Sequence, residues 1–193
     1  TKLTLGGGEH VVTLLLTLVV PLQQAVFGGV VLAILLHFFV TSSHEVRVVQ
    51  LTPAPDGTVI EGPVPPVLAA NAVTVVQVYG NLTFAGAETM EPLLPKVQPA
   101  ERPVVILRLR AQESIGSSMI AVIERYSQQL RRNGGKLLLS GVSPLVKQQL
   151  DRTETSTEVL GSDSVFPATP VLGASTRAAF DAAQQWLAAQ ARL

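Results

Sequence analysis

Hydroxyl side chains cluster in one short stretch of the chain. They belong to Ser114, Ser117 and Ser118. A serine nucleophile needs a general base within hydrogen-bonding distance, and histidine is the usual one. The histidines lie in or beside an apolar segment near the start of the chain, at His10, His37 and His44. The sequence therefore offers no catalytic residues, and we expect a protein that is not an enzyme.

Other chemistries are excluded by composition and spacing. Cysteine is absent, which excludes disulfides, thiolate metal sites and cysteine nucleophiles. No group of His, Asp and Glu has the spacing of metal ligands. The triplet Gly6-Gly7-Gly8 follows no strand and is not followed by Lys-Ser/Thr, so it is not a phosphate-binding loop. With 14 basic and 14 acidic residues, the chain shows no excess charge for nucleic acid. We predict no metal, no cofactor and no nucleic-acid partner.

The serine stretch lies between a predicted strand and a predicted helix. Val104 to Leu109 is an apolar, β-branched run, as a strand covered on both faces requires. Helical spacing follows, with one apolar face made of Met119, Val122, Ile123, Tyr126 and Leu130. Gly134 and Gly135 end this helix, and Lys136 to Ser140 forms the next strand. A unit of this length predicts a right-handed parallel crossover.

Further elements extend this unit to an α/β domain. Glu45 to Leu51 is predicted as an edge strand, Thr58 to Ile60 as a hairpin arm and Ala72 to Tyr79 as a strand. Ala85 to Leu94 is predicted as a short helix interrupted by Pro92. Val165-Phe166 fits either an edge strand or a loop anchor.

The last helices have capping signals. Ser143 before Pro144 predicts an N-cap. Ser175 or Thr176 is predicted to cap a final helix that reaches Leu193. Arg108 and Arg110 are predicted to be exposed charges at a strand end, with a subunit or partner contact left open.

The segment from Val11 to Val40 has a different composition, because it contains no formal charge. As one straight helix its thirty residues would extend roughly 45 Å, more than a hydrocarbon core of about 30 Å. Pro21 divides it, which favours two helical pieces, Val11 to Val20 and Ala25 to Val40. Short spans of this kind persist in lipid when other helices cover their ends. A single-pass anchor and a buried hairpin of a soluble protein are the alternatives.

This contrast predicts two domains. Residues 1–43 are expected to be membrane helices whose ends other helices cover, and residues 44–193 an α/β domain. Because the first residue is not Met and no signal peptide precedes the apolar run, we expect the chain to be part of a longer protein.

Two stretches carry a family resemblance. TVVQVYGNLTFAGAETM and PVVILRLRAQESIGSSMIAVIERYSQQLRRNGGKLLLSGVSPLVKQQLDRT resemble a STAS domain, the fold of anti-sigma-factor antagonists and of the cytoplasmic tails of SulP anion transporters. The preceding TLLLTLVVPLQQAVFGGVVLAILLHFFVTSS resembles the last membrane helices of SulP proteins. The resemblance implies an α/β fold class, a STAS-like mixed sheet flanked by helices, preceded by an all-α transmembrane hairpin.

The resemblance also implies a regulatory site. In anti-sigma-factor antagonists the loop before the central helix reads Asp-Ser-Ser/Thr-Gly, and its first hydroxyl residue is phosphorylated. Here Gly116 stands in place of Asp, Ser117 takes the phospho-acceptor position and Met119 replaces the final Gly. The loop contact surface would consist of Ser114, Ile115, Gly116, Ser118 and Met119. The alternative is that Ser117 is only an N-cap.

The function implied is that of the carboxyl-terminal part of a SulP-type secondary anion transporter of the sulfate or bicarbonate class. The anion site would lie upstream, between discontinuous helices, with no substrate-binding residue in this fragment. The implied partners are the rest of the membrane domain, a second copy in a homodimer, a cytosolic regulatory protein and the lipid bilayer of the cell membrane. The alternative is a membrane-tethered STAS regulatory binding module of the anti-sigma-factor-antagonist type.

Overall fold

The structure, a computed structural model, describes residues 24, 26–34, 46–54, 56, 58–80, 82, 89–110 and 112–192. The chain divides into two compact units, Thr1–Ser43 and His44–Leu193. In the first unit residues 26–34 are helical. The predicted piece Val11 to Val20 and the remaining parts of Ala25 to Val40 lie outside the described residues. Among the helices that are described, none combines the length and apolar character needed to cross a bilayer.

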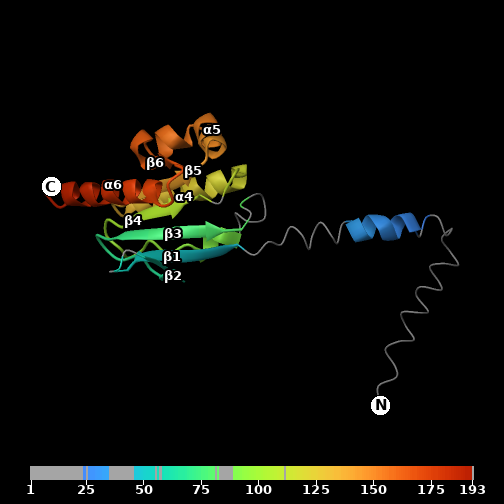
Figure 1. The fold of residues 1–193 in the computed structure, drawn as a ribbon, viewed down its shortest axis with the longest axis horizontal. Coiled ribbons are helices and arrows are strands. Elements are labelled where there is room, and N and C mark those ends of the chain that lie inside the picture. Colours follow the sequence, from blue (N-terminus) through green and yellow to red (C-terminus); the bar gives the residue numbers. More distant parts are fainter. Residues whose placement is uncertain are drawn as a thin grey trace, which may run out of the picture. The chain divides into compact units, whose positions relative to one another are not determined.

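A six-stranded mixed sheet forms the second unit, in the order β2-β1-β3-β4-β5-β6 (Figure 1). Its strands are β1 (Arg47–Pro53), β2 (Val59–Pro63), β3 (Val73–Tyr79), β4 (Val104–Arg108), β5 (Lys136–Val142) and β6 (Val165–Pro167). β1 pairs antiparallel with both β2 and β3, whereas β3 to β6 are parallel neighbours. The β4–β5 crossover is therefore parallel, as the sequence predicts.

Helices cover both faces of the central strands. They are α4 (Ser117–Arg132), α5 (Pro144–Arg152) and α6 (Ala174–Gln190), with shorter turns at η1 (Glu91–Leu93), η2 (Thr155–Val159) and η3 (Ser162–Ser164). On one face, Val105 and Leu139 pack with Met119 of α4 and Val146 of α5. On the other, Ile106 and Leu138 pack with Ala179 and Ala183 of α6. This two-sided burial explains why the central strand β4 is an uninterrupted apolar run from Val104 to Leu107. The predicted fold class, an α/β mixed sheet flanked by helices, is confirmed.

Helix α4 has the predicted apolar face. Its buried residues are Met119, Ile120, Val122, Ile123, Tyr126, Ser127 and Leu130. Asn133 is the C-cap, and Gly134 has a φ of 67°, the left-handed conformation that glycine adopts without steric cost. The amides of Gly134 and Gly135 donate to the carbonyls of Arg131 and Leu130 at 2.9 and 2.8 Å, which satisfies the end of the helix. The chain then enters β5 directly.

Several local predictions are wrong. β1 is not an edge strand, because β2 returns along its other side and takes the edge position. The predicted helix from Ala85 to Leu94 is described only from residue 89, where residues 89–90 are helical and η1 follows. Neither Ser175 nor Thr176 caps α6, since Gly173 occupies the N-cap position.

The hydroxyl of Ser175 has a tertiary function instead. Its Oγ accepts from the amide of Gly141 at 2.8 Å and donates to the carbonyl of Phe166 at 3.0 Å. The side chain therefore joins β5, β6 and the first turn of α6. Of the two readings of Val165-Phe166, the edge strand is the one observed.

Candidate functional site

The candidate site is the loop of residues 112–116 between β4 and α4, at the carboxyl ends of the parallel strands. Gln112 fixes the start of the loop, because its amide donates to Leu109 and its side-chain Nε2 donates to the carbonyl of Gly80 at 2.9 Å. The amide of Gly116 donates to the carbonyl of Leu82 at 3.4 Å. Both ends of the loop are thus bonded to the segment that follows β3.

Helix α5 holds the loop from its other side. The amide of Ile115 donates to Oε1 of Gln149 at 3.0 Å. Ser143 donates its hydroxyl to the carbonyl of Glu113 at 3.1 Å, and the same oxygen accepts from the amide of Val146 at 3.2 Å. Ser143 is therefore the N-cap of α5, as predicted, and also a tether for the loop.

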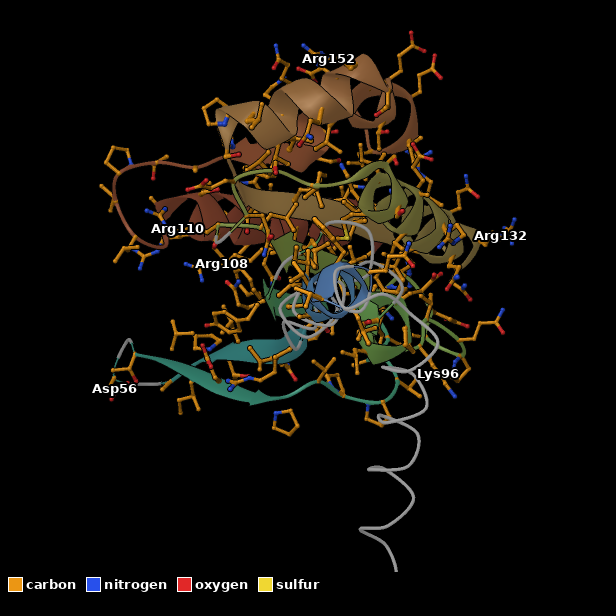
Figure 2. The ribbon with its side chains drawn as sticks, turned by 90° about the vertical axis from the view of Figure 1, so that its right-hand side faces the viewer. Asp56, Lys96, Arg108, Arg110, Arg132 and Arg152 are labelled. Carbon is orange, nitrogen blue, oxygen red and sulfur yellow. The ribbon has the colours of Figure 1, made fainter. Side chains whose placement is uncertain are left out.

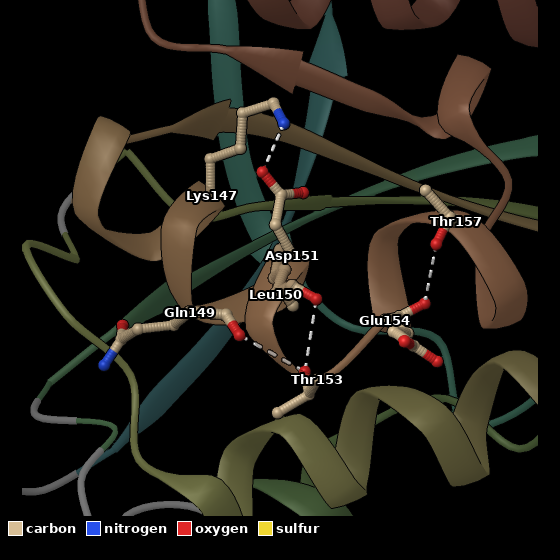
Figure 3. Close-up of polar contacts among 7 residues, drawn as sticks. All are labelled: Lys147, Gln149, Leu150, Asp151, Thr153, Glu154 and Thr157. Atoms are coloured by element: carbon tan, nitrogen blue, oxygen red, sulfur yellow. Dashed lines mark hydrogen bonds and ion pairs between the residues drawn. The ribbon is translucent and has the colours of Figure 1, made fainter.

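The end of α5 is itself fixed by local polar contacts, drawn in Figure 3. Thr153 Oγ1 donates to the carbonyls of Gln149 and Leu150, each at 3.2 Å, and Lys147 pairs with Asp151 at 2.7 Å. Glu154 follows with a φ of 58°, where the chain turns into η2. Because Gln149 is bonded through both its carbonyl and its side chain, the loop is connected to a well-defined helix end.

Ser117 is exposed and is the first helical residue of α4. The N-cap is Gly116, whose φ of −82° and ψ of 165° are extended, and no side chain caps the helix. The alternative that Ser117 is an N-cap is therefore wrong, since the residue with N-cap geometry precedes it. The amides of Met119 and Ile120 donate back to the carbonyl of Gly116 at 3.0 and 3.2 Å.

The predicted contact surface is only partly accessible. Ile115 is 2% exposed and Met119 is fully buried, and both belong to the core that α4 and α5 cover. These two residues cannot form an exposed surface, which corrects that part of the prediction. Ser114, Gly116 and Ser118 are half-buried around Ser117. A partner at this loop would therefore contact mainly Ser117 and its half-buried neighbours.

A helix N-terminus can bind an anion, because its first amides have no intrahelical acceptor and the macrodipole favours negative charge. At α4 these amides belong to the first turn, which begins at Ser117. A phosphate on the Ser117 hydroxyl would therefore be placed where the helix stabilises it. Within the described residues no group of His, Asp and Glu could hold a metal ion.

Two carboxylates of the domain have defined side-chain partners. Glu91 bonds Arg125 of α4 at 2.6 and 3.1 Å, and the hydrogen bond from this guanidinium lowers the pKa of the Glu91 carboxyl. Tyr79 donates its hydroxyl to Glu61, which raises the pKa of Tyr79. Glu91 therefore joins η1 to α4, while Glu61 joins β2 to the end of β3.

Arg108 and Arg110 are half-buried rather than exposed, which corrects the prediction. Arg108 Nη1 donates to Oε1 of Gln77 at 2.6 Å, and Arg110 Nη1 donates to the carbonyl of Thr169 at 2.9 Å. Each acceptor lies in a segment distant in the chain, so neither hydrogen bond can be predicted from local sequence. Gln112 and Gln149 were missed for the same reason, because a glutamine beside an apolar element has no distinctive spacing.

Replacing Ser143 with alanine is expected to destabilise the domain by about 1 kcal/mol, because the cap of α5 is lost. Chemical unfolding of the chain in detergent, followed through the fluorescence of the single Trp186, measures this change. Ser143→Asp is the matched control, since aspartate retains the capping acceptor. An equal loss in both variants would show that the bond to Glu113, not the cap, provides the stability.

Comparison with known proteins identifies the domain. The family model described as the STAS domain matches residues 65–169, more than half of the chain. A comparison with curated proteins gave no match.

Solved structures have a similar fold. A sulfate transporter family protein from Wolinella succinogenes is 23% identical with a TM-score of 0.50, over 70% of this chain and 96% of that one. The murine Solute Carrier 26 family member A9 anion transporter is 17% identical with a TM-score of 0.59, over 91% of this chain and 28% of the transporter. A second structure of SLC26A9 is 13% identical with a TM-score of 0.55, over 86% and 28%. The chain thus spans 28% of the protein in each of these two SLC26A9 structures. By its family match it belongs to the STAS domain family.

Proposed function

We propose that the chain is the carboxyl-terminal part of a SulP-type secondary anion transporter of the sulfate or bicarbonate class. Residues 1–43 would be the last membrane helices and residues 44–193 the cytoplasmic STAS domain. In this assignment the chain holds no anion site and no catalytic centre. The STAS domain serves assembly in a homodimer or regulation, and its first partner is the rest of the membrane domain.

The observation that carries this proposal is the order of the two units. Thirty residues without formal charge, Val11 to Val40, precede the unit that begins at His44 and contains the STAS match. A chain segment of this composition is stable in a bilayer and is unfavourable in water, because its apolar surface would remain exposed. Among the described residues, Val26, Phe27 and Ile34 are 58%, 72% and 62% exposed. Such a surface needs lipid or other helices to cover it.

The coverage of the structural matches also supports the proposal. Residues 44–193 are 150 of the 193 residues, about 78% of the chain. The matches to the SLC26A9 structures cover 91% and 86%, so they include part of residues 1–43. If the chain shared only the STAS fold with these transporters, the matches would be confined to residues 44–193 and would cover at most about 78% of the chain.

The test is anion uptake. The reading frame upstream of Thr1 is expected to encode some ten or more further hydrophobic spans. Proteoliposomes with that longer protein should accumulate radiolabelled sulfate or bicarbonate, whereas proteoliposomes with residues 1–193 alone should not. Flux through the fragment alone, or a start codon immediately before Thr1, would contradict the proposal and favour the membrane-tethered regulatory module.

We further propose that Ser117 is the regulatory position of this domain. Support comes from its exposure and its place at the start of the sixteen-residue helix α4. Mass spectrometry of the protein isolated from its native host should find phosphate on Ser117. Consistent absence of the modification in abundantly expressed protein would contradict this role, and a cytosolic partner would then have to recognise the unmodified loop.

A further inference from the structure

Two arginines lie beside each other at the carboxyl end of the sheet, and neither has an acidic partner among the described residues. Arg108 and Arg110 donate to the neutral oxygens of Gln77 and Thr169, and neither takes part in an ion pair within the described residues. In Figure 2 they lie close together at the same side of the domain. Their hydrogen bonds fix the side chains, and no carboxylate in the described part of the chain pairs with either positive charge. The pair is therefore suited to an anionic surface.

Exposed apolar side chains surround the same end of the sheet. Arg110 bonds the loop that follows β6, and this loop carries Val171 and Leu172, which are 67% and 77% exposed. Leu145, in the first turn of α5 just after β5, is 50% exposed. Single exposed apolar residues are ordinary, but an adjacent exposed pair beside two uncompensated arginines is typical of a surface that contacts a membrane interface.

The chain enters the domain at this end. β1 begins at Arg47, which pairs with Tyr79, the last residue of β3. β4 and β5 are parallel to β3 and end on the same side. Only six residues separate Val40, the end of the charge-free segment, from Arg47. Even fully extended, this connection reaches at most about 25 Å. The chain that follows the charge-free segment therefore enters the domain at the end that carries Arg108 and Arg110.

We propose that this end of the STAS domain docks on the anionic headgroups of the membrane in which residues 11–40 are embedded, with Arg108 and Arg110 at the phosphates and Val171 and Leu172 inserted between the lipids. The proposal rests on the assignment of residues 1–43 to the membrane. Guanidinium groups form bidentate hydrogen bonds with phosphate, and basic residues near an anionic leaflet are attracted within a Debye length. Because only six residues connect Val40 to Arg47, the effective concentration of this end of the domain at the membrane surface is high.

The absence of cysteine permits a direct test, because one introduced cysteine is a unique labelling site. Leu172→Cys carries a fluorophore, and residues 1–193 are reconstituted into vesicles whose acyl chains bear bromine atoms, which quench only nearby probes. Vesicles contain phosphatidylcholine alone or with phosphatidylglycerol. We expect strong quenching at 172 with phosphatidylglycerol and weak quenching without it. Replacing both Arg108 and Arg110 with glutamine should reduce the docking equilibrium about five-fold for each charge removed.

Three controls make the outcome decisive. A probe at Gln129→Cys, near the end of α4 at the opposite end of the sheet, should not be quenched. Arg108→Lys with Arg110→Lys keeps both charges and should retain most of the quenching, which separates charge from folding.

A probe at Val31→Cys reports on the membrane assignment itself. Quenching at 31 without quenching at 172 would overturn only the docking proposal, whereas absence of quenching at 31 would overturn the proposed function. Equal quenching at 172 in both lipid mixtures would also overturn the docking proposal, since headgroup charge would then have no role.

Discussion

Replacing Gly135 with alanine is expected to destabilise the domain by about 3 kcal/mol, because the added methyl group has no space. A Cβ at this position would overlap the carbonyl oxygen of Pro103 and lie 3.1 Å from the carbonyl oxygen of Leu130. Both are backbone atoms, so no side chain can move aside. The overlap occurs where α4 ends and β5 begins beside β4, and relief would require the strands to separate. Thermal or urea unfolding, with Trp186 fluorescence as the signal, measures the change.

Gly62 is the matched control for this substitution. It lies in the edge strand β2, and nothing would come within 4 Å of an added Cβ. Gly62→Ala should leave the free energy of unfolding within about 1 kcal/mol of the original value, with a small gain from the restricted unfolded chain. Similar losses of unfolding free energy in both variants would mean that the close approach of Gly135 to Pro103 is not the cause of the destabilisation.

Replacing Met119 with glycine, the residue of the anti-sigma-factor-antagonist motif, should cost about 4 kcal/mol. Met119 is fully buried on the inner face of α4, so its replacement leaves a cavity in the core as well as a glycine in the first turn of the helix. The same unfolding measurement applies. Restoration of the family residue is thus expected to harm this domain, because the surrounding core is built around the longer side chain.

The second departure from the motif provides the contrast. Gly116→Asp introduces the acidic residue at an N-cap with extended backbone angles, which aspartate adopts readily. We expect a change of no more than about 0.5 kcal/mol, in the stabilising direction. A large loss of stability in Gly116→Asp together with a small one in Met119→Gly would contradict this account. The loop, rather than the packing of the core, would then explain why this chain departs from the family motif.

The sequence predicts the central unit well because its signals are local. The apolar face of α4, the glycine at its end and the Ser143-Pro144 start of α5 each depend on neighbouring residues, and the structure confirms them. The position of a strand within the sheet is not encoded locally in this way. β1 has the same residues whether or not β2 returns along its free side, so its interior place could not be read from its pattern.

Side chains with distant partners account for the remaining differences. Ser175 has the composition of a cap, but its hydroxyl bonds Gly141 and Phe166, which are 34 and 9 residues away in the chain. Arg108 and Arg110 were expected in solvent for the same reason, because Gln77 and Thr169 become their neighbours only in the folded sheet. At the loop, the sequence located Ser117 correctly beside the helix start, yet it could not show that Ile115 and Met119 point into the core.

The interior place of β1 has a mechanical consequence. The chain enters β1 at Arg47, and β1 is hydrogen-bonded along both sides, to β2 and to β3. Tension applied through this connection along the strand therefore loads both ladders in shear, so their bonds must break together. A strand at the margin of the sheet would instead peel away one bond at a time. The domain is thus attached at a point that resists pulling, and a movement of the preceding segment would displace it as a rigid body before β1 came loose.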